Sequence, residues 1–149
     1  SDLITTDTGM QTQKTFMPFV VAFCCRRSAA QARELAMCMG HRLPQGLRVV
    51  EVPCSGAVSY DHIFTALENN ADGVMILTCH KGNCHSEHGN IYAGQTVEQI
   101  QEMFSRIGFE KERLLIQTLA SNMGTEFAQI ADRFEETIMK LGPSRLKKN

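Results

Sequence analysis

Short apolar runs alternate with amphipathic stretches along this chain. Four runs, at residues 19–23, 47–52, 74–78 and 113–119, have the length and content of strands. The first is continuously apolar, as expected for a strand that is buried on both faces. Each run is followed by a stretch with helical periodicity. The clearest is the last, where apolar residues recur every three or four positions: Phe127, Ile130, Phe134, Ile138 and Leu141.

Capping residues and glycines predict where the helices begin and end. Side chains that favour helix starts stand before each periodic stretch, at Ser28, Ser59, Thr96 (with Gln99 in a capping box) and Ser121. Glycines that favour helix ends follow three of them, at Gly40, Gly108 and Gly142. The first helix is therefore expected over residues 29–39.

This alternation of strand and helix predicts an α/β fold. Strands separated by helices run parallel with right-handed crossovers, so we expect a single open four-stranded sheet flanked by helices, flavodoxin-like, with strand order 2-1-3-4. The length of 149 residues suits one domain. We assign residues 1–16 to a polar tail or linker, 17–143 to the domain and 144–149 to a C-terminal tail.

Charge and composition narrow the class of protein. A net charge of −1 gives no basis for nucleic-acid binding, and no apolar stretch approaches the roughly 20 residues that cross a bilayer, so no membrane insertion is expected. The polar N-terminus does not resemble a secretory signal, which favours a cytoplasmic, reducing compartment. There, six cysteines indicate metal binding or redox chemistry, with an exported, disulfide-containing domain as the weaker alternative.

Cysteines follow three of the four predicted strands. Cys24 and Cys25 end the first, Cys54 follows the second by two residues, and Cys79 follows the third directly, with Cys84 five residues later. The carboxyl ends of parallel strands share one edge, where open α/β sheets bind their ligands. The thiols are therefore expected to converge.

A two-iron cluster is the first interpretation of these cysteines. In its all-cysteine form it needs four thiolates, and the spacing from Cys79 to Cys84 is that of the first two ligands in plant-type ferredoxins. Cys54 would be the third ligand and one of Cys24 and Cys25 the fourth, because adjacent strand residues point to opposite faces. Zinc is the alternative metal, since a histidine could replace one thiolate and three lie in the same loop: His80, His85 and His88.

Other features bear on the chemistry. Arg26, Arg27 and Lys81 add positive charge near the cysteines, which would favour the reduced state of an anionic cluster. The remaining cysteine, Cys38, is expected to be a buried small hydrophobe within the first helix. A thiol redox enzyme that uses the Cys24–Cys25 pair is a further alternative. No dinucleotide, Walker or nucleophile-elbow motif is present, so we expect no substrate chemistry of the domain's own.

At these residues the chain resembles the delta subunit of methyl-viologen-reducing hydrogenase. Several segments carry the resemblance: Phe23-Cys-Cys25, Cys54-Ser-Gly56, Ala71-Asp-Gly-Val74, Cys79-His-x-Gly-x-Cys84-His85, Gly89-Asn90 and residues 121–127. Family members often have Cys-Cys-x-x-Cys at the first strand end, whereas this chain has Ser28 at the last of those positions.

The resemblance implies a function in electron transfer. It implies a [2Fe-2S] cluster held by Cys24 or Cys25 with Cys54, Cys79 and Cys84. It also implies electron transfer between a flavoprotein of the heterodisulfide reductase type and a hydrogenase, a dehydrogenase or a quinone-linked protein. The same kind of domain is found fused to such flavoproteins, and the polar start of this chain would suit a domain excised from such a fusion.

Overall fold

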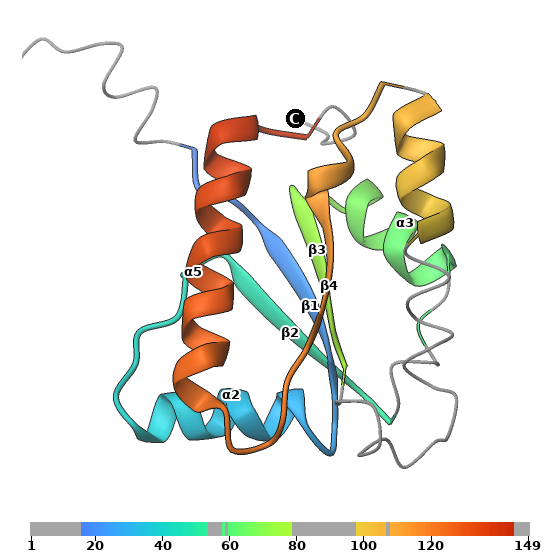
Figure 1. The fold of residues 1–149 in the computed structure, drawn as a ribbon. Coiled ribbons are helices and arrows are strands. Elements are labelled where there is room, and N and C mark those ends of the chain that lie inside the picture. The colour runs from blue at the N-terminus through green and yellow to red at the C-terminus, as the bar shows by residue number, and fades with distance from the viewer. Residues whose placement is uncertain (1–15, 54–57, 59, 79–97, 107, 145–149) are drawn as a thin grey trace, which may run out of the picture.

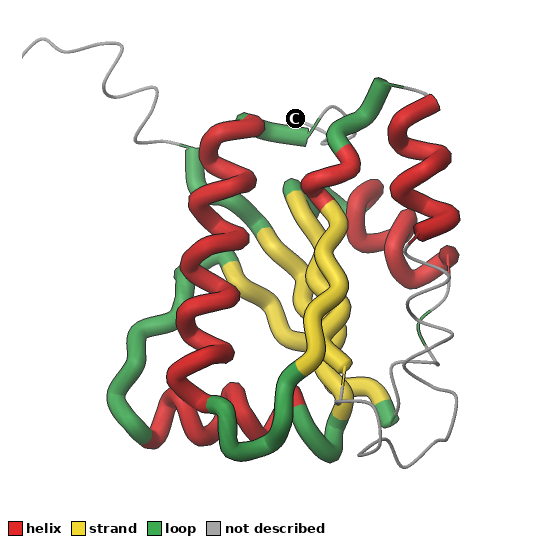
Figure 2. The backbone as a smooth tube through the Cα atoms, viewed as in Figure 1, coloured by secondary structure: helices red, strands yellow, loops and turns green. Residues whose placement is uncertain are grey.

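The fold is a four-stranded parallel sheet with helices on both faces (Figures 1 and 2). The computed structural model describes residues 16–53, 58, 60–78, 98–106 and 108–144. The strands are β1 (Val20–Cys25), β2 (Leu47–Val52), β3 (Gly73–Thr78) and β4 (Leu114–Thr118). Their order is β2-β1-β3-β4, with every neighbouring pair parallel. The predicted fold class and strand order are confirmed.

Helices divide between the two faces of the sheet, as Figure 1 shows. One face is covered by α2 (Ala29–Cys38) and α5 (Gly124–Leu141), and the other by α3 (Tyr60–Glu68) and a helix that includes residues 98–106. A single 3-10 turn, η2 (Lys111–Arg113), leads into β4. Among the described residues no helix is long and apolar enough to cross a membrane.

Strand alternation builds two hydrophobic cores, one on each face. Val21, Phe23, Val74 and Ile76 pack in the α3-side core, and their neighbours Val20, Ala22, Met75 and Leu77 pack in the α5-side core. All residues of β1 and β3 are buried, as expected for the two central strands.

The three glycines predicted at helix ends adopt the left-handed backbone conformation, and one predicted helix start is wrong. Gly40, Gly108 and Gly142 have positive φ angles of 83°, 78° and 83°. Ser121 does not cap α5, which begins at Gly124 with Met123 before it. A Cβ on Gly124 would lie 2.9 Å from the Ala36 nitrogen, so the close packing of α5 on α2 defines this start.

The first helix departs from the prediction in two ways. It ends at Cys38 rather than at Met39, and Ser28 occupies the capping position without a side-chain hydrogen bond to the helix. Cys38 is exposed rather than buried. The buried face of α2 consists of alanines (Ala29, Ala30, Ala32 and Ala36), and Cys38 lies off that face. Ser59 and Thr96, the other predicted caps, lie outside the described residues.

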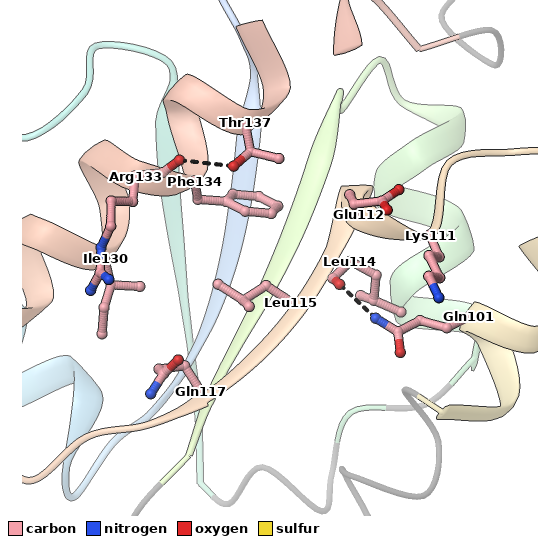
Figure 3. Close-up of a pocket in the computed structure, with 10 residues that line it drawn as sticks. All are labelled: Gln101, Lys111, Glu112, Leu114, Leu115, Gln117, Ile130, Arg133, Phe134 and Thr137. Atoms are coloured by element: carbon pink, nitrogen blue, oxygen red, sulfur yellow. Dashed lines mark hydrogen bonds between the residues drawn. The ribbon is translucent and has the colours of Figure 1, made fainter. Parts of the chain in front are cut away.

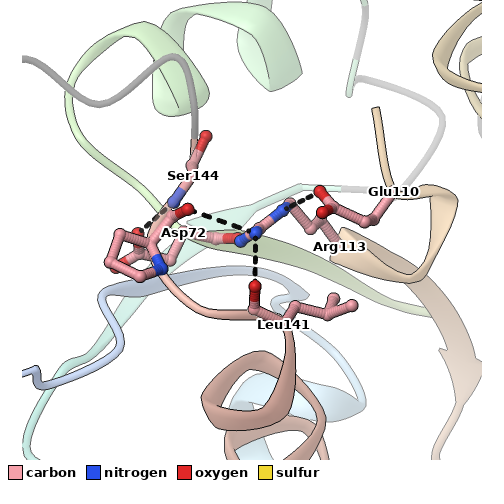
Figure 4. Close-up of polar contacts among 6 residues, drawn as sticks. Asp72, Glu110, Arg113, Leu141 and Ser144 are labelled. Carbon is pink, nitrogen blue, oxygen red and sulfur yellow. Dashed lines mark hydrogen bonds and ion pairs between the residues drawn. The ribbon is translucent and has the colours of Figure 1, made fainter. Parts of the chain in front are cut away.

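The buried side chain of Arg113 connects several segments at the amino-terminal edge of the sheet (Figure 4). Its side chain is 1% exposed. Its Nε donates to Glu110 Oε1 at 2.8 Å, and one Nη donates to the Asp72 carbonyl oxygen at 2.9 Å. The other Nη reaches the carbonyl oxygens of Leu141 and Pro143 at 3.5 and 3.3 Å. These contacts compensate the cost of burying the guanidinium.

Asp72 joins distant parts of the chain at the same edge. It is fully buried, and its two carboxylate oxygens accept the backbone N–H groups of Phe19 and Ser144 at 2.9 and 3.0 Å. The next residue, Gly73, has no room for a Cβ because the Phe134 ring and Ile138 Cδ1 lie against it. The Ala-Asp-Gly-Val segment therefore supports the fold at the edge opposite the cysteines.

Candidate functional site at the carboxyl edge of the sheet

The carboxyl ends of the strands form one continuous edge. The Arg26 N–H, just beyond β1, donates to the Val52 carbonyl oxygen at the end of β2, at 2.8 Å. The Leu119 N–H, just beyond β4, donates to the Thr78 carbonyl oxygen at the end of β3, also at 2.8 Å. Val52, Cys25 and Thr78 therefore end neighbouring strands at the same level of the sheet.

Cys24 faces the α5-side core. It is fully buried and packs with Val20, Ala22 and the alanines of α2. Burial raises the pKa of the Cys24 thiol to about 12, against a smaller lowering effect of the nearby Arg33 guanidinium. Such surroundings are those of a structural thiol in a hydrophobic core.

Cys25 occupies the opposite face. It is the last residue of β1, pairs in register with Val52 and is 5% exposed. Alternation along the strand puts it on the face of Phe23, which belongs to the α3-side core. Since Cys24 pairs with Leu77, the next step of that register brings Thr78 beside Cys25 on the same face.

Two buried hydroxyls near Cys25 have no hydrogen-bond partner within the described part of the chain. They are Thr78 Oγ1 and Ser28 Oγ, on residues that are 1% and 4% exposed. Ser28 closes the turn after β1, where its N–H donates to the Cys25 carbonyl oxygen at 3.2 Å. Buried donors of this kind normally have an acceptor, and sulfur atoms of a metal cluster are suitable acceptors. The residues present thus fit such a group.

Positive charge faces the same edge. Arg26 and Arg27, directly after Cys25, are both exposed. The next element, α2, begins at Ala29, so the unpaired N–H groups of its first turn lie close to the end of β1. Both features would stabilise negative charge at this edge.

The other predicted ligands lie outside the described residues. Cys54, Cys79 and Cys84 are among them, as are His80, His85, His88 and Lys81. Across the described ranges no three His, Cys, Asp or Glu side chains come together as a metal site. The pair of buried hydroxyls, on Ser28 and Thr78, was not predicted from the sequence. A signal for one of them was present, because Thr78 is the only polar residue of β3.

Comparison with known proteins shows the family of this chain. Residues 20–142 match the family described as the delta subunit of methyl-viologen-reducing hydrogenase. The chain belongs to this family. The match begins at the first residue of β1 and ends just after α5, so it covers the whole sheet and its helices.

Two hydrogenase subunits match this chain over most of its length. An iron-sulfur subunit of the F420-non-reducing hydrogenase of Archaeoglobus profundus is 34% identical over 131 residues, 88% of this chain and 96% of the relative. The vhu iron-sulfur subunit of the same kind of hydrogenase from Methanopyrus kandleri is 34% identical over 124 residues, 83% of this chain and 94% of the relative.

One relative is much longer. It is a component of the ferredoxin/F420H2-dependent CoB-CoM heterodisulfide reductase of Methanosarcina acetivorans and is 29% identical over 130 residues. The match covers 87% of this chain but only 16% of that relative. The domain therefore resembles both small separate subunits and one part of a larger protein.

Proposed function

We propose that the domain is an electron-transfer module that holds a [2Fe-2S] cluster at the carboxyl edge of its sheet. The ligands would be Cys25, Cys54, Cys79 and Cys84. When bound, the cluster would accept and donate single electrons. The observation that carries the proposal is the position of Cys25, at the end of a central strand and beside Thr78, within a family whose relatives are named iron-sulfur subunits.

Chain connectivity supports this ligand set. Neighbouring strands lie about 4.8 Å apart and one residue spans at most about 3.6 Å. Cys79 follows Thr78 directly, and Cys54 follows Val52 by two residues. Both cysteines are thus tethered within about 12 Å of Cys25, which makes a common cluster sterically accessible.

The two faces of β1 discriminate between the adjacent cysteines. Cys24 is enclosed by the α5-side core, so a cluster bound there would have to displace alanines of α2. Cys25 lies on the face where Thr78 Oγ1 lacks a partner among the described residues. The protein's part in electron transfer would be to hold the thiolates, to donate hydrogen bonds from Thr78 and Ser28, and to favour the reduced state through Arg26 and Arg27.

The proposed partners follow from the relatives, which include components of hydrogenases and of a heterodisulfide reductase. We propose that the domain relays electrons between a flavoprotein of the heterodisulfide reductase type and a hydrogenase, a dehydrogenase or a quinone-linked protein. Residues 17–143 would form this module.

The test is anaerobic purification and reconstitution, followed by iron and acid-labile sulfide assays, visible absorption, and electron paramagnetic resonance after dithionite. We expect about two irons and two sulfides per chain. Cys25→Ala should lose them, whereas Cys24→Ala should keep them and lose only packing energy. An iron-free protein after reconstitution, or cluster loss confined to Cys24→Ala, would contradict the proposal.

The same experiment separates the alternatives. Zinc without sulfide would indicate a zinc-stabilised domain. A thiol enzyme that uses Cys24 and Cys25 would keep its activity in Cys54→Ser. The side chains of Cys24 and Cys25 lie on opposite faces of the sheet. A disulfide between them would require β1 to distort at its end, which argues against a thiol redox enzyme that uses this pair.

A further inference from the structure

The outer edge of β4 lies in a groove of about 440 Å³ between helices of the two faces (Figure 3). From α5 it is lined by Ile130, Arg133, Phe134 and Thr137, and from the other face by Gln101. β4 is the last strand of the sheet, and its side chains Leu114, Leu115 and Gln117 complete the lining. The groove therefore runs along a strand edge that has no fifth strand beside it among the described residues.

Some backbone hydrogen-bonding groups of β4 point away from the sheet at its outer edge. The Leu119 N–H is directed to β3, so alternation turns the N–H and C=O groups of Leu114, Ile116 and Thr118 outwards. Gln101 Nε2 donates to the Leu114 carbonyl oxygen at 2.9 Å, which confirms this direction and blocks one acceptor. For the outward groups of Ile116 and Thr118 no partner is seen in the part of the chain that the structure describes.

An open strand edge is ordinarily protected by charge, bulges or a covering element. Here the flanking helices leave a slot instead, with an apolar wall made by Leu115, Ile130 and Phe134. We propose that this groove binds an extended polypeptide segment of a partner protein, which adds to the sheet as a fifth strand beside β4.

Charge identifies the chemistry of the segment. The groove is lined by two cations, Lys111 and Arg133, and by one anion, Glu112. Two other carboxylates of α5, Asp132 and Glu136, are not part of the lining. The segment that fits is one that alternates apolar side chains with polar ones and carries a carboxylate near Arg133.

A second copy of this chain does not fit the same space. Its own β4 would lie between the corresponding helices, so two such edges could not approach to the 4.8 Å or so that strand pairing needs. The occupant must therefore be a single strand without flanking helices. None of the residues that line the groove belongs to β1 or to the proposed cluster ligands, so peptide binding can be measured on the cluster-free protein.

The probe is a library of random twelve-residue peptides displayed on phage, selected against the immobilised protein, with the strongest binder then synthesised and measured by fluorescence anisotropy. We expect alternating apolar peptides that contain Asp or Glu. Ile116→Pro removes an outward N–H, and Thr137→Trp fills the groove from α5. Each variant should weaken peptide binding about tenfold or more. The proline variant loses main-chain pairing with the peptide, and the tryptophan variant blocks access to the groove.

Two matched controls decide the outcome. Val49→Pro removes an outward N–H from β2, the other edge of the sheet, and should change binding less than about twofold. Arg133→Glu should weaken binding, whereas Lys140→Glu, the same charge change elsewhere on α5, should not. The proposal would be overturned if both proline variants weakened peptide binding equally, or if Thr137→Trp left peptide binding unchanged. It would also be overturned if the selection gave no binding peptide. A dimer, seen by light scattering, that Thr137→Trp dissociates would overturn it as well.

Discussion

The two ends of the sheet treat their buried polar groups in opposite ways. At the amino-terminal edge, Arg113 and Asp72 are buried and each makes several hydrogen bonds. At the carboxyl edge, the hydroxyls of Ser28 and Thr78 are equally buried but lack partners among the described residues. The contrast is between an edge whose buried polar groups are paired and an edge whose buried hydroxyls have no partner in the described part of the chain.

The largest effect is expected at the amino-terminal edge. Arg113→Met leaves the Glu110 carboxylate and three backbone carbonyl oxygens without their donor, and should lower the free energy of unfolding by about 3–5 kcal/mol. Urea unfolding measures this loss. Arg106→Met is the control, because its pair with Glu102 is exposed and should contribute less than about 1 kcal/mol. Similar losses in both variants would remove the distinction between the two ends.

The second largest effect is expected from overpacking at the same edge. Gly73→Ala places a Cβ about 2.7 Å from Ile138 Cδ1 and against the Phe134 ring. Overpacking of this kind costs about 1–3 kcal/mol. Thermal unfolding would show the loss, and Ile138→Val, which removes that Cδ1 atom, should recover part of it. A fully additive double variant would show that the contact is not the cause.

The carboxyl edge should behave in the opposite sense. Thr78→Val removes a buried hydroxyl that has no hydrogen-bond partner among the residues the structure describes, so the cluster-free protein should keep its stability or gain up to about 1 kcal/mol. In the reconstituted protein the same change removes a proposed donor to sulfur and should lower the reduction potential. Redox titration checks the second effect, with Thr118→Val on the next strand as the control. A marked loss of stability without a change in reduction potential would contradict the proposed role of Thr78 as a hydrogen-bond donor to the cluster.

The smallest effect concerns Glu135, a partly exposed carboxylate of α5. Partial burial, with Asp132 and Glu136 adding to it, raises the pKa of Glu135 above its ordinary 4.5. The ionised form therefore destabilises the fold above that raised pKa, and the penalty disappears as the pH falls through it to below 4.5. Because solvent screens this partly exposed carboxylate, Glu135→Gln should stabilise the protein at pH 7 by no more than about 0.5 kcal/mol. Unfolding at pH 7 and pH 4 tests this, since the gain should be absent at the lower pH.

Much of the fold could be predicted from short-range patterns. The apolar runs and helical periodicities predicted all four strands and their order, because buried central strands leave continuous apolar sequence. The start of α5 could not be predicted in this way. Ser121 is a good capping residue, but the contact of Gly124 with Ala36 determines where that helix begins. Local preference was overridden by tertiary packing.

The site was predictable only in part. The convergence of strand ends follows from topology, and the structure confirms that Cys25, Val52 and Thr78 share one edge. The face to which each cysteine points could be assigned only from the structure. Cys24 and Cys25 are adjacent residues of the same type, but they face different cores. Cys38 was wrongly predicted to be buried because its apolar neighbours outweighed the alanine face of α2.

The two oxygens of Asp72 also bring the ends of the domain together. One accepts the N–H of Phe19, at the entrance to β1, and the other that of Ser144, after α5, at 2.9 and 3.0 Å. The two nitrogens are thus within about 8 Å of each other, since the oxygens of one carboxylate are about 2.2 Å apart. A domain that enters and leaves at one point can be inserted into another polypeptide, or circularly permuted, without disturbing either partner. Such a domain can be joined to different polypeptides while its own fold is kept.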